Sequence, residues 1–147
     1  MKRKGFTLVE LLLVLAIIGV VTAITMPSLV RSIRGNRLRE AVRTVVMMGK
    51  YTRSTALLEQ KQAELVITID TASLEVKDGI RRELDRVQID FVELPATDER
   101  LSEGRYSVFY HSNGTCTPYR VQVTDEWGQS VLIEVDRLGT SETSRES

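Results

Sequence analysis

One long apolar run near the start of the chain constrains the fold more than any other feature. From Phe6 to Met26 the only charged residue is Glu10. About 20 apolar residues are enough to cross a bilayer as a helix, at ~1.5 Å per residue. The preceding basic cluster, Lys2 to Lys4, predicts that this end stays cytoplasmic and that the rest of the chain faces the periplasm or the outside.

Three interpretations of this run compete. An ordinary secretory signal peptide would be cut after Val21-Thr22-Ala23, leaving Ile24 as the mature N-terminus. A plain membrane anchor would stay uncut. In the third interpretation the run is a segment in which Glu10 itself has a function. A carboxylate inside an apolar run costs roughly 2.5–3.5 kcal/mol on insertion into the membrane, so such residues usually have a purpose. A signal peptide or a simple anchor gains nothing from that cost.

The segment KGFTLVELLLVLAIIGVV, Lys4 to Val21, resembles the cleavage and methylation motif of type IV prepilins. The resemblance implies that a prepilin peptidase cuts between Gly5 and Phe6, and that Phe6 becomes the N-methylated first residue. Glu10 would be the carboxylate needed for filament assembly. Pro27 stands where many pilins carry a helix-kinking proline.

The physical chemistry of these residues agrees with those roles. Gly5 has no side chain, so a protease can approach its backbone closely. Cleavage creates an α-amino cation at Phe6, four residues before Glu10. In a filament of staggered helices that cation can meet Glu10 of a neighbour, so each charge finds a partner in a dry environment.

Beyond Pro27 the apolar residues recur at steps of three and four up to Leu58, which predicts an amphipathic helix. Because proline lacks an N–H, we expect one long helix from about Thr7 to Lys61 that bends at Pro27. Its first part, 6–27, would be the transmembrane or filament-core helix, and 28–61 the amphipathic half. The arginines from Arg31 to Arg43 indicate a juxtamembrane cluster rather than a nucleic-acid site.

After Lys61 the pattern changes to a period of two, which predicts a β-rich head over 62–139. Residues 96–103 and 125–128 read as a loop and a hairpin turn, and 140–147 as a polar tail that frays. The expected strands are Glu64–Asp70, Ser73–Lys77, Arg86–Leu94, Arg105–Tyr110, Tyr119–Thr124 and Ser130–Asp136.

A leading helix followed by short antiparallel strands predicts an α+β fold, with the helix packed on an antiparallel sheet. This order resembles the GspH/FimT-type family, the H-type minor pseudopilins of type II secretion and their minor pilin relatives. The resemblance rests on a segment like Tyr106–Gly114, then a β-hairpin, then a turn like Asp136–Gly139. It implies a pilin-like subunit, single-pass in the inner membrane with its head in the periplasm.

Nothing in the sequence predicts a catalytic, metal or cofactor site. Lys and Arg together number 20, as do Asp and Glu, so no global charge favours nucleic acid. Cys116 is the single cysteine and His111 the single histidine, with no third member to make a catalytic set. Asp125-Glu126-Trp127-Gly128 reads as a turn in which Gly128 supplies a positive φ and Trp127 packs on the sheet.

The leading hypothesis is a non-enzymatic minor pseudopilin or pilin that acts in filament assembly and protein secretion. Its expected partners are the prepilin peptidase, other pilins, the inner-membrane assembly platform and membrane lipid. One alternative is a minor pilin that captures DNA, although the tail Ser141–Ser147 lacks the basic patch it would need. Another is a secreted domain with an ordinary signal peptide. The sequence leaves open whether the machine is a secretion system or a pilus.

Overall fold

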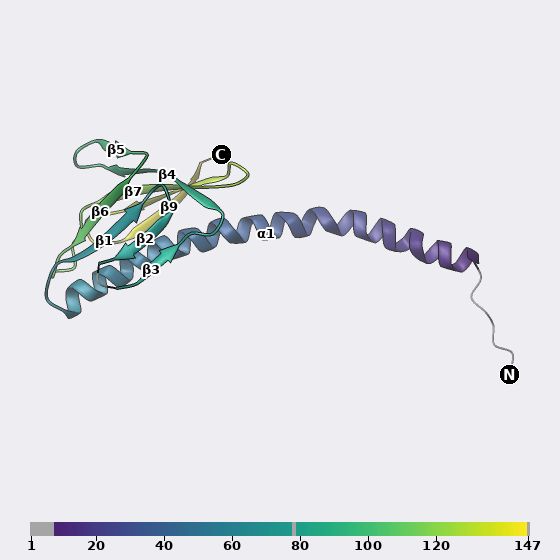
Figure 1. The fold of residues 1–147 in the computed structure, drawn as a ribbon, viewed down its shortest axis with the longest axis horizontal. Coiled ribbons are helices and arrows are strands. Elements are labelled where there is room, and N and C mark those ends of the chain that lie inside the picture. Colours follow the sequence, from purple (N-terminus) through teal and green to yellow (C-terminus); the bar gives the residue numbers. More distant parts are fainter. Residues whose placement is uncertain (1–7, 78, 147) are drawn as a thin grey trace. The chain divides into compact units, whose positions relative to one another are not determined.

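The computed structural model describes residues 8–77 and 79–146; the side chains of 24–35 and of 146 are not among those described. Over these residues the chain forms one helix, α1 (Leu8–Leu58), followed by nine strands (Figure 1). The chain divides into two compact units, Met1–Asn36 and Arg37–Ser147. We call the second unit the head. The division between the two units falls inside α1, after Asn36, whereas the sequence suggested a division after residue 27.

Within the head, α1 is amphipathic, as its spacing predicts. Its buried residues recur at three- and four-residue steps and are Leu38, Ala41, Val45, Met48, Thr52 and Ala56. Charged residues such as Arg39, Arg43 and Lys50 occupy exposed positions between them. The helical backbone continues through Pro27, whose side chain lies outside those described, so the bend expected there stays a prediction.

The first sheet has four antiparallel strands in the order β3-β2-β1-β6. In its central strand, Leu65 pairs with Val76 on one side and Val108 on the other, and all three side chains are buried. The hairpin expected across Thr71-Ala72 is present. The strands are β1 (Ala63–Thr68), β2 (Ser73–Val76), β3 (Arg81–Glu83) and β6 (Arg105–Tyr110).

The second sheet has five antiparallel strands in the order β5-β4-β7-β8-β9. Inward residues of β7 alternate with partly exposed ones, as expected of a sheet with one face on the core. A register shift between Ile89 and Phe91 interrupts the pairing of β4 with β7. The strands are β4 (Val87–Leu94), β5 (Glu99–Leu101), β7 (Tyr119–Asp125), β8 (Ser130–Val135) and β9 (Ser141–Glu146).

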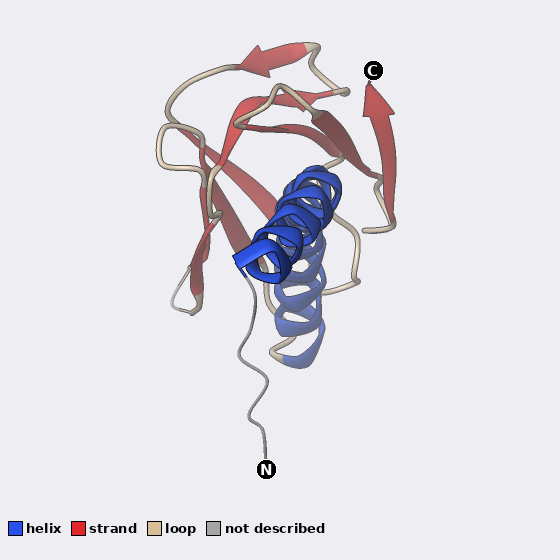
Figure 2. Ribbon diagram, turned by 90° about the vertical axis from the view of Figure 1, so that its right-hand side faces the viewer, coloured by secondary structure: helices blue, strands red, loops and turns tan. Residues whose placement is uncertain are grey.

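The helix face and both sheets share one core. Val45 of α1, Leu65 and Ile67 of the first sheet, and Val121 and Ile133 of the second are all 0% exposed and belong to one buried cluster. Figure 2, which looks along α1, shows the strands curving around the helix. The expected fold class, an α+β head with the helix on antiparallel strands, is therefore confirmed.

Three short strands differ from the expectation. Residues 140–147 were expected to fray as a polar tail, but β9 pairs with β8 over six residue pairs. Residues 96–103 were expected to be a loop, but they contain β5, which pairs with β4. The third, β3, was not expected at all. All three are edge strands held by backbone hydrogen bonds, which need no apolar alternation in the sequence.

Candidate functional site

The site that the sequence singles out lies at the beginning of the chain. Gly5 and Phe6 are outside the described residues, so the cleavage predicted between them stays a prediction. Glu10 lies in the first turn of α1. An acidic residue there is favourable because the N-terminal end of a helix carries a partial positive charge.

The helix that follows Glu10 is apolar all round and exposed. Every described residue from 8 to 23 is exposed, including eleven large apolar ones over this stretch. Helices of this kind are normally covered by protein or by lipid, because the exposure of apolar surface to water is unfavourable in free energy. The eleven are Leu8, Val9, Leu11, Leu12, Leu13, Val14, Leu15, Ile17, Ile18, Val20 and Val21.

Over the described residues, no helical stretch meets both the length and the apolar character needed to cross a membrane. Both ends of the predicted segment 6–27 include residues whose side chains are not described.

The head offers no reactive thiol. Cys116 is only 3% exposed, and its Sγ donates a hydrogen bond to the Asp136 carbonyl at 3.1 Å. Burial raises the pKa of this thiol, which disfavours the nucleophilic thiolate. His111 is exposed. Among the described residues, no group of three His, Cys, Asp or Glu side chains could hold a metal ion.

Sequence reasoning missed a buried tyrosine pair beneath α1. The hydroxyls of Tyr110 on β6 and Tyr119 on β7 are 3.1 Å apart, so this hydrogen bond joins the two sheets. Burial raises the pKa of Tyr110 to about 12 and that of Tyr119 well above its ordinary value. Gly49 makes room for the pair, since a Cβ at this position would lie 2.8 Å from the Tyr110 hydroxyl. A glycine inside an amphipathic helix was the available signal.

A second missed residue, Arg53, fastens α1 to two turns. Its Nε donates a hydrogen bond to the Gly114 carbonyl at 3.0 Å. Gly139, at φ 73°, lies so close that an added Cβ would be 3.1 Å from the Arg53 Cδ. The segments Tyr106–Gly114 and Asp136–Gly139, which carry the family resemblance, thus meet at one arginine of the helix.

The predicted turn at residues 125–128 is confirmed. The Asp125 amide donates to the Gln129 carbonyl, the Gly128 amide donates to the Asp125 carbonyl, and Gly128 has φ 78°. Asp125 Oδ1 accepts from the amides of Trp127 and Gln129, both at 2.9 Å. Trp127 is 40% exposed, so the larger part of this residue is covered.

The surface of the head has two notable hollows along α1. One, of about 340 Å³, is lined by both polar and apolar residues, among them Glu59, Lys77 and Phe109. The other, of about 170 Å³, is lined by Thr44, Met47, Met48, Tyr51, Ile80 and Arg82. Tyr51 contributes to both.

Comparisons with known proteins agree with this arrangement. Residues 1–26 match the prokaryotic N-terminal methylation motif. The structure is similar to the minor pseudopilin EpsH of the Vibrio cholerae type II secretion system, with a TM-score of 0.58 and 14% identity over 76% of this chain and 96% of that one. A second EpsH structure gives a TM-score of 0.56 and 16% identity, over 74% of this chain and 97% of that one.

The type IV minor pilin FimU of Pseudomonas aeruginosa is similar in the same way, with a TM-score of 0.52 and 11% identity over 73% of this chain and 92% of that one. No curated protein matches the sequence. The chain thus combines a prokaryotic N-terminal methylation motif with a pilin-like fold. More particularly, this fold is similar to that of the minor pseudopilin and the minor pilin above.

Proposed function

We propose that this chain is a minor pseudopilin or minor pilin subunit, processed by a prepilin peptidase and built into a type II secretion or type IV pilus-like filament. The observation that carries the proposal is the exposed, apolar first part of α1, in which Glu10 of the first turn is the one carboxylate among the described residues 8–23. This stretch lies inside the match to the N-terminal methylation motif. That surface needs an apolar cover, first lipid and then the helices of neighbouring subunits.

The proposed course has two stages. Before assembly, residues 6–27 hold the chain in the inner membrane with the head in the periplasm, and the assembly platform receives it there. After cleavage, the Phe6 amine meets Glu10 of an adjacent subunit. Each charge then has a partner inside the filament, where an unpaired charge is costly.

The head acts by binding rather than by catalysis in this proposal. Its thiol is buried, with a pKa raised by burial, and its histidine lies on the surface. Its hollows along α1 offer contact surface to other subunits or to exported cargo. The proposal therefore includes no enzymatic activity and no cofactor.

The test combines processing with a change at Glu10. Mass spectrometry of the mature protein should show N-methyl-Phe6 as its first residue. In Glu10→Ala, membrane insertion and cleavage should persist, because a costly charge is removed from lipid and the scissile bond lies four residues away. Incorporation should fail, because a neighbour's amine is left buried and unpaired, a loss on the order of 3–5 kcal/mol.

Crosslinking to sibling pilins and a secretion or pilus assay measure incorporation. Leu11→Ala is the matched control, since it removes apolar surface beside Glu10 without changing charge, and it should still assemble. Glu10→Leu should fail like alanine, and Glu10→Asp should recover part of the signal. A mature N-terminus at Ile24 would overturn the processing, and normal incorporation of Glu10→Ala would overturn the charge pairing.

A further inference from the structure

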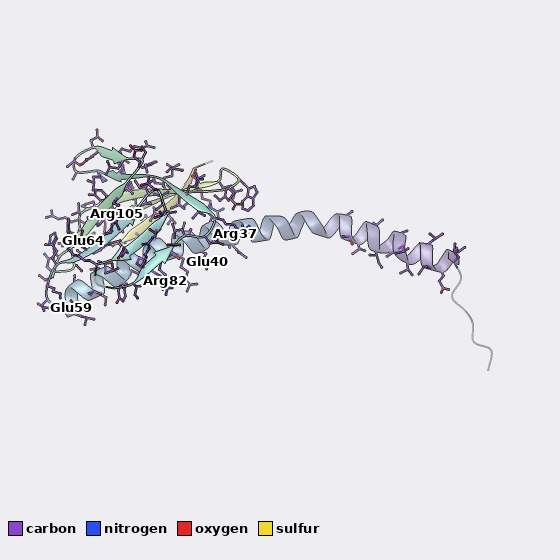
Figure 3. The ribbon with its side chains drawn as sticks, viewed as in Figure 1. Arg37, Glu40, Glu59, Glu64, Arg82 and Arg105 are labelled. Atoms are coloured by element: carbon purple, nitrogen blue, oxygen red, sulfur yellow. The ribbon has the colours of Figure 1, made fainter. Side chains whose placement is uncertain are left out.

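The head half of α1 carries an excess of positive charge. Arg37 and Glu40 mark its beginning, and Glu59 follows its end (Figure 3). Between residues 37 and 58 the only carboxylate is that of Glu40. The basic residues of the same stretch are Arg37, Arg39, Arg43, Lys50 and Arg53.

Three of these cations lie along one line of the helix surface. Arg39, Arg43 and Lys50 follow one another at steps of four and seven residues, which return to the same face of an α-helix. All three are exposed, on the side of α1 opposite its buried residues. We call Arg39, Arg43 and Lys50 the basic stripe. Its positions are spaced by about 6 Å and about 10 Å along the helix axis.

The basic stripe has no anionic partner in the described part of the chain, since none of its side chains forms an ion pair there. Glu40 lies beside the stripe in a surface cavity with Arg37, and it forms no ion pair with a described residue either. The charges of the stripe are therefore available to another molecule. Most arginines of the strands differ in having partners. Those with an ion pair are Arg81, Arg86, Arg105 and Arg120, and Arg100 stacks on Phe91.

Exposed apolar side chains accompany the basic stripe. Met47 is 56% exposed next to the stripe, and Leu57, which is 40% exposed, continues its line about two turns beyond Lys50. Methionine and arginine are both enriched in protein interfaces. The mixture of cations and apolar side chains favours a protein partner over a nucleic acid, whose backbone offers phosphates but no apolar cover.

Lipid headgroups are a poorer match for the basic stripe than protein. Arg39 comes 12 residues after Pro27, the expected end of the membrane segment, which is about 18 Å along the helix. The headgroup layer on each side of a bilayer is only about 5–8 Å deep. This length favours contact between the stripe and the heads of neighbouring subunits.

We propose that the basic stripe binds the head of a different pilin-like subunit, through a surface with carboxylates at the spacing of the stripe and an apolar side chain against Met47. This inference rests on the proposed function, in which neighbouring helices cover the apolar part of α1, and the same helix continues into the head. A second copy does not fit alongside α1, because it would bring the same excess of cations and like charges repel. A minor subunit also has mainly other chains as its neighbours.

The test is photocrosslinking of the full chain in cells that contain the filament machinery. Met47→p-benzoylphenylalanine places a photoreactive ring beside the stripe, at an exposed position outside the core. Mass spectrometry of the digested adduct then identifies the segment that lies in contact. We expect a segment of a different pilin-like chain, with acidic residues at the spacing of the stripe.

Charge reversal tests the role of the stripe itself. Arg39→Glu, Arg43→Glu and Lys50→Glu combined should lower the adduct by about tenfold or more, because carboxylates then face carboxylates. The three corresponding changes to glutamine should lower it less, since they remove the attraction without adding repulsion. A matched control reverses the same number of charges away from α1 and should leave the adduct unchanged. Its residues are Arg105, Arg137 and Arg145, all of them exposed.

A charge swap completes the experiment. Replacing the carboxylates of the identified segment with lysine should restore the adduct to the reversed stripe. All the changes lie on the surface of this chain, and the protease resistance of its head in the membrane checks that each variant stays folded.

An adduct to lipid, to nucleic acid, to a second copy of this chain or to a segment without carboxylates would overturn the proposal. The absence of an adduct, or an adduct that survives charge reversal, would overturn it as well. Cleavage at Gly5 and Glu10-dependent incorporation are scored in the same cells. If incorporation persists without the expected adduct, the stripe contact alone is wrong; if the unaltered chain is not incorporated, both proposals fall.

Discussion

At the scale of single residues, Gly49 decides how closely α1 can approach the sheets. Its missing side chain leaves space for the hydroxyls of Tyr110 and Tyr119, at 2.8 Å and 3.2 Å from where a Cβ would stand. Helix propensity favours alanine over glycine by about 1 kcal/mol. Packing and propensity therefore oppose each other at this position, and the rigid, hydrogen-bonded tyrosine pair should prevail.

We expect Gly49→Ala to lower the free energy of unfolding of the head by about 1–2 kcal/mol, since overpacking in a dense core costs more than the helix gains. Tyr110→Phe removes the atom that the new Cβ meets. In that background Gly49→Ala should be neutral or stabilising. Denaturant unfolding of the four variants of this cycle measures the coupling, and additive effects would contradict the proposed clash.

The tyrosine pair also predicts a loss of stability at high pH. Because burial raises both pKa values in the folded head, the neutral hydroxyls favour folding. That contribution is fully present below the unfolded-state pKa, about 10, and is lost as pH rises through it towards the Tyr110 value of about 12. Thermal unfolding of the head between these pH values should show the decline. In Tyr119→Phe the decline should be shallower; an unchanged slope would contradict the assignment.

At the scale of elements, side-chain pattern explains which predictions held. The head half of α1 and the strands β1, β4, β6, β7 and β8 each bury alternating or helically spaced apolar residues, so period alone locates them. By contrast, β3 and the central residues of β9 are exposed, and β5 is nearly so. Each of these strands forms because a neighbouring strand offers unpaired backbone groups. The sequence of the edge strand itself carries no pattern that reveals such a neighbour.

The exposed character of β9 predicts that it contributes little to stability. Removing 141–147 deletes backbone hydrogen bonds to β8, but each is worth only about 0.5–1.5 kcal/mol net, and ordering the strand costs entropy. We expect the truncated head to unfold cooperatively with a loss of no more than about 2 kcal/mol. Denaturant unfolding checks this, and a deletion that starts at Ser130 and so removes β8 should abolish the transition. Loss of cooperativity on removing β9 alone would show that it is structurally essential.

At the scale of the whole molecule, the sequence singles out a candidate site but gives no signal of the contacts inside the head. Glu10 stood out because a charge in an apolar run is conspicuous without any structure. The roles of Gly49 and Arg53 depend on residues more than 60 positions away, Tyr110 and Gly114 among them, so only the folded head reveals them. The hollow lined by Met47, Tyr51 and Ile80 was equally hidden, since Met47 and Ile80 come together only through packing.

The division of the chain predicts that the head folds by itself. A fragment that begins at Arg37 keeps every buried core residue from Leu38 onward. We expect a soluble monomer with one cooperative thermal transition, measured by circular dichroism and sedimentation. A fragment that begins at Lys50 lacks Val45 and Met48 and should not fold. Aggregation of the Arg37 fragment without a transition would contradict the division.

The continuity of α1 also determines how the protein bears mechanical load. The same helix carries the apolar segment at one end and contributes Leu38, Val45, Met48 and Ala56 to the core of the head. Tension applied along its axis therefore reaches the head as shear, in which successive helical turns and the Arg53 contact resist together. A pull across the edge at β9 would instead peel one strand from the sheet, a few hydrogen bonds at a time.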